Sequence, residues 1–179
     1  MEFFEVVNNR HSYRGPFTDA PVPDEDLSRI VEAGIKAPSG GNRQSTSFVV
    51  VNDASVIEQI AALAPNSQVL ATCPALIAIV VNRPPESEAP GPCFGFQDYA
   101  AAMENMLLAI TALGYASVWL EGMLHSQEGK GARAVADILG VPSPKVVRAL
   151  IPVGVAAEPL SDRGRKPFDE RACWNRWAG

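Results

Sequence analysis

The chain has 179 residues, of which 47% are hydrophobic and 20% are charged, and its formal net charge is −5. This length is typical of one domain that buries a core, and the acidic balance argues against nucleic acid or a membrane surface as a partner. With three cysteines, no CxxC pair and only two histidines, the sequence predicts neither a disulfide framework nor a metal site. No apolar segment reaches the roughly 18–20 residues of a membrane span, and Met1 to Arg14 does not resemble a secretory signal. We therefore expect a cytoplasmic protein.

The first predicted element is a short amphipathic helix that carries Phe3, Phe4, Val6 and Val7 and ends at Asn8-Asn9. It leads into the segment Arg10-His11-Ser12-Tyr13-Arg14, where two arginines lie four residues apart around an imidazole and a hydroxyl. The planar guanidinium group carries five donors in a geometry that matches phosphate oxygens. This segment is therefore a candidate site for a doubly charged phosphate, whereas any one of its arginines alone would be better explained as a solvated surface residue.

A second helix is predicted from Asp24, which can cap it, to the residue before Pro38, with Leu27, Ile30, Val31, Gly34 and Ile35 at helical spacing. Ala37 to Gln44 then combines turn-forming residues with two adjacent glycines, which let the backbone approach a ligand closely. The amides of Asn42 and Gln44 offer donors and acceptors that suit a heteroaromatic ring. Taken alone, this segment is better explained as an ordinary helix-to-strand turn with solvated amides.

The middle of the chain predicts a short strand from Phe48 to Val51, followed by a helix that Asp53 starts. Ala75 to Val81 is apolar throughout and predicts a central strand buried on both faces. Arg83 to Pro92 contains four prolines, and it fits a mobile loop over a site and a simple surface excursion equally well. Cys73 is expected to be a small core residue, whereas Cys93 lies in a loop rich in proline and glycine.

The longest predicted helix runs from Phe96 to Leu113 and is apolar nearly all round, which favours a place in the middle of the protein or across a dimer interface. Gly114 is expected to end it. Three further elements follow: a strand from Ala116 to Leu120, a helix from Gln127 to Leu139 and a strand from Val146 to Val155. Because Pro152 lacks a backbone donor, we expect a strand end or a sheet edge at that position.

The last segment, Pro159 to Gly179, is polar, contains two tryptophans and includes the cationic stretch Arg163-Gly164-Arg165-Lys166. It is poorly suited to an independent core, so we expect it to dock against the body of the protein or against a partner chain. On an acidic protein, a site-specific anion explains the local cations better than a diffuse polyanion does. We therefore predict that folding brings the two basic segments together around one phosphate.

Six pieces of the sequence, in this order along the chain, resemble the nitroreductase family of flavin-dependent oxidoreductases. They are Arg10-His11-Ser12-x-Arg14; Ala37-Pro38-Ser39-x-x-Asn42-x-Gln44; Asp98 opening a helix that runs into Leu113-Gly114; Ser117-x-Trp119-x-Glu121-Gly122; Pro152-Val153-Gly154; and Arg163-Gly164-Arg165. The resemblance spans nearly the whole chain. One departure is that Ser45-Thr46-Ser47 follows Gln44, where the family often has an aromatic residue.

The resemblance implies an α+β fold, with a mostly antiparallel central sheet flanked by helices, in an intertwined homodimer with FMN sites at the subunit interface. It implies a single flavin-binding domain over residues 1–179, with 159–179 as a C-terminal docking extension. By the same resemblance, the phosphate and ribityl chain contact Arg10, Ser12, Arg14, Arg163 and Arg165, with His11 beside them. The flavin is also reached by Pro38, Ser39 and Asn42 from the other subunit, with Gln44 among the cofactor-binding residues. Glu121 and Gly122 line the isoalloxazine ring, and the Gly122 N–H lies near N5.

The implied activity is the transfer of hydride from NADH or NADPH, through flavin N5, to a nitroaromatic, a quinone or an activated alkene in a ping-pong cycle. Because the flavin carries out this reaction, we name no catalytic side chain. Other interpretations stay open: a flavin carrier or redox sensor without fast NAD(P)H turnover, a related flavin enzyme such as a reductive dehalogenase, or an interaction domain without flavin. The sequence favours neither NADH nor NADPH.

Overall fold

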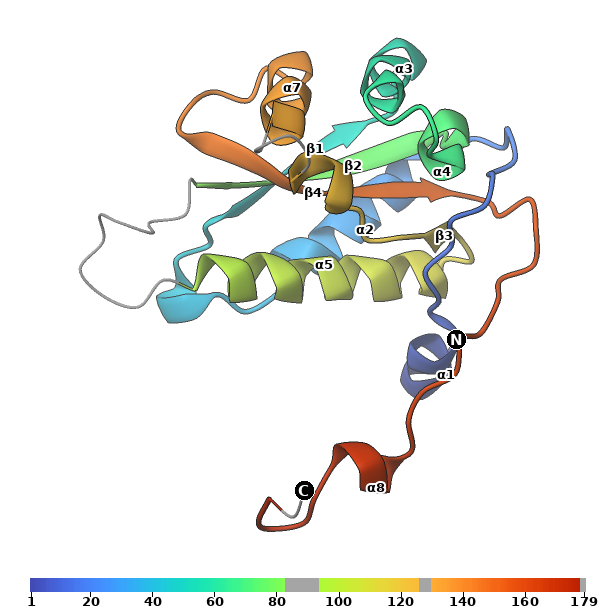
Figure 1. The fold of residues 1–179 in the computed structure, drawn as a ribbon, viewed down its shortest axis with the longest axis vertical. Helices are drawn as coiled ribbons and strands as arrows, with labels where there is room; N and C mark the ends of the chain where they lie inside the picture. Colours follow the sequence, from blue (N-terminus) through green and yellow to red (C-terminus); the bar gives the residue numbers. More distant parts are fainter. Residues whose placement is uncertain (83–93, 126–129, 178–179) are drawn as a thin grey trace.

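The computed structural model describes residues 1–82, 94–125 and 130–177, and it is built around a four-stranded sheet in the order β1-β2-β4-β3 (Figure 1). The strands are β1 (Thr46–Val51), β2 (Ala75–Asn82), β3 (Ala116–Ser117) and β4 (Lys145–Gly154), and all neighbouring strands are antiparallel. The helices are α1 (Phe3–Asn9), α2 (Asp24–Ile35), α3 (Ala54–Ala62), α4 (Gln68–Thr72), α5 (Gly95–Ala112), α6 (Gly122–His125), α7 (Lys130–Ile138) and α8 (Phe168–Arg171), with a short 3₁₀ helix, η1 (Gly40–Asn42). The predicted α+β fold is confirmed.

Two layers of helices cover the sheet. Helices α2 and α5 pack on one face, and α3, α4, α6 and α7 pack on the other, so that the buried residues form one cluster on each side (Figure 1). In β2, the side chains of Ile77 and Ile79 join the first cluster, whereas those of Leu76, Ala78 and Val80 join the second, as the alternation of a strand requires. The prediction that this strand is central and buried on both faces is confirmed.

Of the two helix starts predicted at aspartates, the one at Asp53 is confirmed and the one at Asp24 needs a correction. Asp53 caps α3 by accepting the backbone N–H of Ser55 at 2.8 Å. By contrast, Asp24 does not cap α2 but is its first residue, after Pro23, and its carboxylate accepts the side-chain amide of Asn52 at 2.7 Å. An acidic residue in the first turn still interacts favourably with the helix dipole, which explains why the sequence signal marked the right place but the wrong contact.

Strand β4 lies inside the sheet, which corrects the expectation of an edge or a strand end at Pro152. Leu120 and Leu150 exchange two backbone hydrogen bonds of 3.0 and 2.9 Å. Because backbone direction alternates along a strand, the nitrogen of Pro152 faces the same side as that of Leu150, where it has no hydrogen to donate. The pairing of β3 with β4 reaches Val153 but is interrupted at this point. The proline therefore breaks the ladder toward β3 only, while Pro152 still pairs with Leu76 of β2.

Other boundaries differ from the sequence-based ones. The strand predicted over Ala116–Leu120 shortens to β3 plus the isolated Leu120–Leu150 bridge. Helix α7 starts at Lys130, and residues 126–129 lie outside the described part of the chain, as do the predicted loop 83–92 and Cys93. Cys73 is buried as expected, and no helix among the described residues is long and apolar enough to cross a bilayer.

Both ends of the chain extend away from the sheet, with α1 and α8 below α5 in Figure 1. The residues after Glu158 are almost all exposed, and Trp174 and Trp177 keep 80% and 81% of their surface accessible. The C-terminal segment therefore does not pack on the body of its own chain. Docking on a partner chain stays a prediction.

Candidate functional site

The N-terminal basic segment runs beside β3. Ser12 forms a parallel bridge with Ser117, and the backbone N–H of Tyr13 donates to the carbonyl of Ser117 at 2.8 Å. From Ser117 the chain leads within a few residues to Glu121-Gly122, at the start of α6. Two of the predicted site segments, remote in sequence, are thus held side by side by backbone hydrogen bonds.

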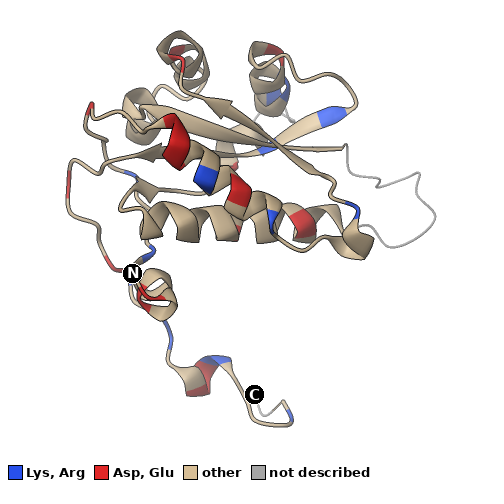
Figure 2. Cartoon of the chain, turned by 180° about the vertical axis from the view of Figure 1, so that it is seen from behind, with Lys and Arg blue, Asp and Glu red and all other residues tan. Residues whose placement is uncertain are grey.

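An extended stretch after β4 brings the C-terminal basic segment close to the N-terminal one. This stretch is antiparallel to the residues that follow Arg14, through the bonds Thr18 N–H to Val155 O (2.9 Å) and Ala157 N–H to Pro16 O (3.1 Å). Further on, Nδ1 of His11 lies 3.9 Å from a carboxylate oxygen of Asp162, the residue before Arg163. Figure 2 shows basic residues just after α1 and on the stretch that leads to α8, at one end of the molecule.

Of the four arginines in these two segments, one forms an ion pair with a carboxylate in the described part of the chain. Nε of Arg10 lies 3.9 Å from Glu104 of α5. In the described part of the chain, the other three, Arg14, Arg163 and Arg165, form no ion pair and are exposed. Their guanidinium groups are therefore free to bind an external anion. The predicted convergence of all of them on one phosphate stays a prediction.

The loop that carries the other predicted contacts is fastened to α5. Asp98, only 7% exposed, accepts the backbone N–H of Gly40 at 2.8 Å and the hydroxyl of Ser45 at 3.1 Å. Within the loop, the hydroxyl of Ser39 accepts the N–H of Gln44 at 2.9 Å. Asn42 and Gln44 adopt left-handed backbone angles, with φ of 53° and 48°. Such strained residues persist only where the surroundings fix them, and they gather at ligand sites.

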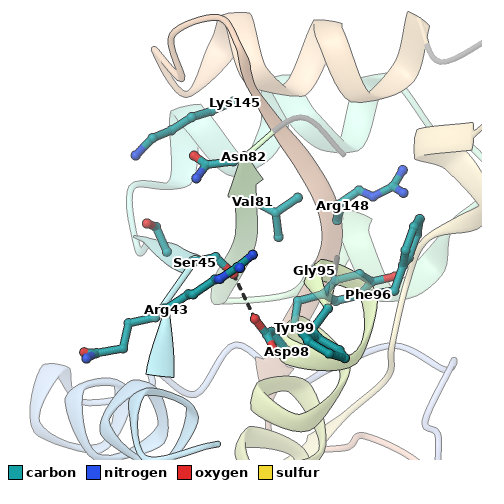
Figure 3. Close-up of a pocket in the computed structure, with 13 residues that line it drawn as sticks. Arg43, Ser45, Val81, Asn82, Gly95, Phe96, Asp98, Tyr99, Lys145 and Arg148 are labelled. Carbon is teal, nitrogen blue, oxygen red and sulfur yellow. Dashed lines mark hydrogen bonds between the residues drawn. The ribbon is translucent and has the colours of Figure 1, made fainter. Parts of the chain in front are cut away.

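Two cavities adjoin this loop. The smaller, of about 140 Å³, is lined by Pro38, Ser39 and Gln44 among others. The larger, of about 460 Å³, includes Gln44 but no other predicted cofactor-binding residue (Figure 3). Neither cavity is lined by any member of the N-terminal and C-terminal basic segments, or by Gly122. Within one chain, the two sets of predicted cofactor contacts therefore share neither of these two cavities.

Glu121 and Gly122 lie at the entrance to α6. The hydroxyl of Tyr99 donates to a Glu121 oxygen at 2.8 Å, and Nε2 of His125 lies 3.9 Å from the other oxygen. Gly122 is exposed, and a Cβ atom there would meet no atom within 4 Å. The residues that the structure describes offer its N–H no hydrogen-bond acceptor. This backbone donor is thus accessible to a ligand.

Asp98 and Tyr99 are the supporting residues whose roles the sequence did not give. Asp98 was noted only as the residue that opens a long helix, and a single carboxylate near the start of an otherwise apolar helix was the available signal. Tyr99 gave no signal, because its partner Glu121 is 22 residues away. Asp98 holds the loop that carries predicted cofactor contacts, and Tyr99 holds the side chain of Glu121, another predicted contact.

The replacement Asp98→Ala is expected to destabilise the protein and loosen the loop before β1. It leaves the Gly40 N–H and the Ser45 hydroxyl without their charged acceptor, so the free energy of unfolding should fall by about 1.5–3 kcal/mol. Urea denaturation measures this change. Asp19→Ala, at an exposed aspartate, is the control and should leave the midpoint unchanged; an equal loss in both variants would contradict the role of Asp98.

The Tyr99–Glu121 contact predicts an alkaline loss of stability. Burial, followed by the hydrogen bond to Glu121 and its charge, raises the pKa of Tyr99 to about 12, compared with about 10 in an unfolded chain. Because the folded state holds the proton more tightly, this stabilisation is complete below about pH 10 and is lost as pH rises toward about 12. Urea unfolding at pH 8 and pH 11 should therefore show a larger decrease in the wild type than in Tyr99→Phe. Equal decreases would disprove the linkage.

Comparison with known proteins gives the same picture in sequence and in fold. A sequence model described as the nitroreductase family matches residues 7–68 and 62–155. A candidate NADH dehydrogenase/NAD(P)H nitroreductase of Archaeoglobus fulgidus is 33% identical over 153 residues, which cover 86% of this chain and 84% of that protein. An NADPH-flavin oxidoreductase of Vibrio harveyi is 26% identical over 140 residues, covering 73% of this chain and 56% of that protein. The crystal structure of a candidate nitroreductase of Desulfovibrio desulfuricans in complex with FMN has a TM-score of 0.81 and 28% identity, with 99% of each chain covered.

Proposed function

Because the chain belongs to the nitroreductase family, we propose that it is an FMN-dependent oxidoreductase that passes hydride from NAD(P)H to a nitroaromatic, a quinone or an activated alkene. The observation that carries this proposal is the pairing of Ser12 with Ser117. This pairing places the basic segment, whose side chains can donate hydrogen bonds to a phosphate, beside the stretch that leads to Gly122. The N–H of Gly122 has no acceptor among the described residues. The names of the relatives from Archaeoglobus and Vibrio, and the FMN complex from Desulfovibrio, support the flavin and the nicotinamide donor.

The residues present fit a flavin mononucleotide. Arg14, Arg163 and Arg165 are exposed and have no carboxylate partner in the described part of the chain, as a phosphate site needs. The open space around Gly122 lets a flat ring approach the backbone closely. His11, beside Asp162, would lie next to the phosphate. These features suit a cofactor with a dianionic end and a planar end.

When bound, FMN supplies the hydride chemistry at N5, and the chain's own residues hold and orient it. The arginines would neutralise the phosphate, and the Gly122 N–H would donate to the ring. Tyr99 donates a hydrogen bond to the carboxylate of Glu121 and would hold it beside the ring. No side chain of this set needs to transfer a proton for hydride to move, so we assign positioning and electrostatic roles only.

We propose that the site is completed by a second copy of the chain. The two cavities that adjoin the loop carrying Pro38, Ser39, Asn42 and Gln44 are not lined by the two basic segments of the same chain. Large apolar side chains are exposed on α1 and on the C-terminal segment, which is unusual for a surface that faces water only. On the outer side of α5, Leu108 is half-buried and Ala112 is exposed. An intertwined homodimer would cover these residues and bring the loop of one subunit to the basic segments of the other.

The absorbance of the purified protein near 450 nm, a wavelength roughly typical of flavins, tests this function. We expect a yellow protein with one FMN per chain, and anaerobic addition of NADH or NADPH should bleach it. Flavin that neither nicotinamide reduces would support a carrier or redox sensor instead. A colourless protein that cannot be reconstituted with FMN would reject the proposal.

A further inference from the structure

The larger cavity has a composition that the proposed cofactor contacts do not explain. It lies at the end of the sheet where β2 finishes and β4 begins, between the loop before β1 and the start of α5 (Figure 3). Among the described residues, three cationic side chains line it, those of Arg43, Lys145 and Arg148, against one carboxylate, that of Asp98. Asp98 already accepts two hydrogen bonds from the loop. The cavity is thus a local excess of positive charge on an acidic protein.

None of the three cations is paired with a carboxylate among the residues that the structure describes. Lys145 and Arg43 are exposed, whereas Arg148 is half-buried. Figure 3 shows Arg43 reaching in from the loop before β1 and Arg148 from β4. Positive side chains around a hollow, with no carboxylate partner among the described residues, favour an anionic ligand.

The backbone of β4 is built to turn Arg148 into this cavity. Ala149 pairs with Ile79 and Val147 pairs with Val80, so Arg148 is the extra residue of a β-bulge. A bulge changes the direction of a side chain and is common beside functional sites. The guanidinium carbon of Arg148 lies 4.6 Å from the ring centre of Phe96 on α5, which holds the side chain by a cation–π contact.

The side of the cavity formed by α5 carries aromatic side chains. Phe96 and Tyr99 both line the cavity, and their ring centres lie 6.1 Å apart. The volume of about 460 Å³ falls in the lower half of the range of small-molecule pockets, roughly 300–1,000 Å³, which suits a molecule of one or two rings rather than a dinucleotide. Rings on one side and cations around the rim favour a ligand that is flat, apolar in its body and negatively charged at one end.

We propose that this cavity binds a small planar aromatic carboxylate, with the ring beside Phe96 and Tyr99, the carboxylate against Arg148, and Arg43 and Lys145 adding to the positive charge around the cavity. The proposal concerns binding rather than turnover, so its test requires no hydride transfer by the flavin. Exposed charges contribute modestly and are screened by salt. The half-buried Arg148 is therefore expected to contribute most to affinity.

Isothermal titration of the purified, FMN-loaded protein with 2-naphthoate, and with its neutral amide 2-naphthamide, tests the site. We expect naphthoate to bind at least about ten-fold more tightly than the amide, since its carboxylate gains charge-assisted hydrogen bonds. Arg148→Gln should weaken naphthoate binding about ten-fold and Lys145→Gln about three-fold. Affinity for the amide should change little in either variant.

Lys130→Gln is the matched control, because Lys130 is also exposed but lies at the start of α7, away from the cavity. It should bind naphthoate like the wild type. Lys145→Gln and Arg43→Gln alter exposed residues only, so they keep the test valid if Arg148→Gln folds poorly by circular dichroism. Equal affinity for the acid and the amide, no binding of naphthoate, or an equal loss in Lys130→Gln would each overturn the proposal.

Discussion

Replacing Arg165 with alanine is expected to release FMN from the protein while leaving the fold intact. Arg165 is exposed, and its only described hydrogen bond is to the adjacent carbonyl of Gly164, so its loss removes no packing. A charge-assisted hydrogen bond to phosphate contributes about 1.5–3 kcal/mol, which corresponds to a rise of about 10- to 150-fold in the dissociation constant for FMN. Arg10→Ala should act in the same direction, with a small additional loss from its contact with Glu104.

Fluorescence titration of the stripped protein with FMN measures this effect. Riboflavin, which has the same ring but no phosphate, is the discriminating ligand, because its affinity should be unaffected by Arg165→Ala. Arg29→Ala is the matched control, since Arg29 pairs only with Asp26 on the surface of α2. Variants that keep stoichiometric FMN and the wild-type affinity would show that the phosphate lies elsewhere.

The sheet and its helices could be predicted because their signals are local. The uninterrupted apolar run of β2 and the helical spacing in α2 are each contained in a few neighbouring residues, and both elements formed where expected. Pro152 shows the limit of such signals. Its missing donor does interrupt a ladder, but whether a strand has one neighbour or two depends on topology, which no local pattern contains.

In the candidate site, too, some features have local sequence signals and others depend on long-range contacts. Arg10, Asn42 and Gly122 are predicted as site residues from motifs, since each is marked by its own sequence context, and their roles stay predictions. The contacts that position them could not be predicted in this way. Asp98 reaches Gly40 across 58 residues and Tyr99 reaches Glu121 across 22. The bulge that redirects Arg148 comes from the pairing of two strands more than 60 residues apart. Long-range hydrogen bonds and register are products of the packed fold.

The double replacement Trp174→Ser and Trp177→Ser is expected to dissociate the proposed homodimer. Their exposed fractions of 80% and 81% are costly for an isolated chain in water, and tryptophans are frequent anchors of protein interfaces. Truncating one such anchor costs about 2 kcal/mol or more, so the double variant, which loses both anchors in each subunit, should raise the dimer dissociation constant by at least about 10³-fold. Sedimentation equilibrium of the wild type and the variant measures it.

The double variant keeps Arg163 and Arg165, so it separates assembly from direct phosphate binding. Because the site is proposed to need both chains, FMN affinity should fall together with dimerisation and recover when the protein concentration is raised. Val50→Ser, at an exposed apolar residue of β1, is the control and should leave the dimer intact. A double variant that stays dimeric at the lowest measurable concentration would mean that the C-terminal segment does not join the two subunits. FMN lost from a dimer of full stability would instead place the tryptophans beside the cofactor.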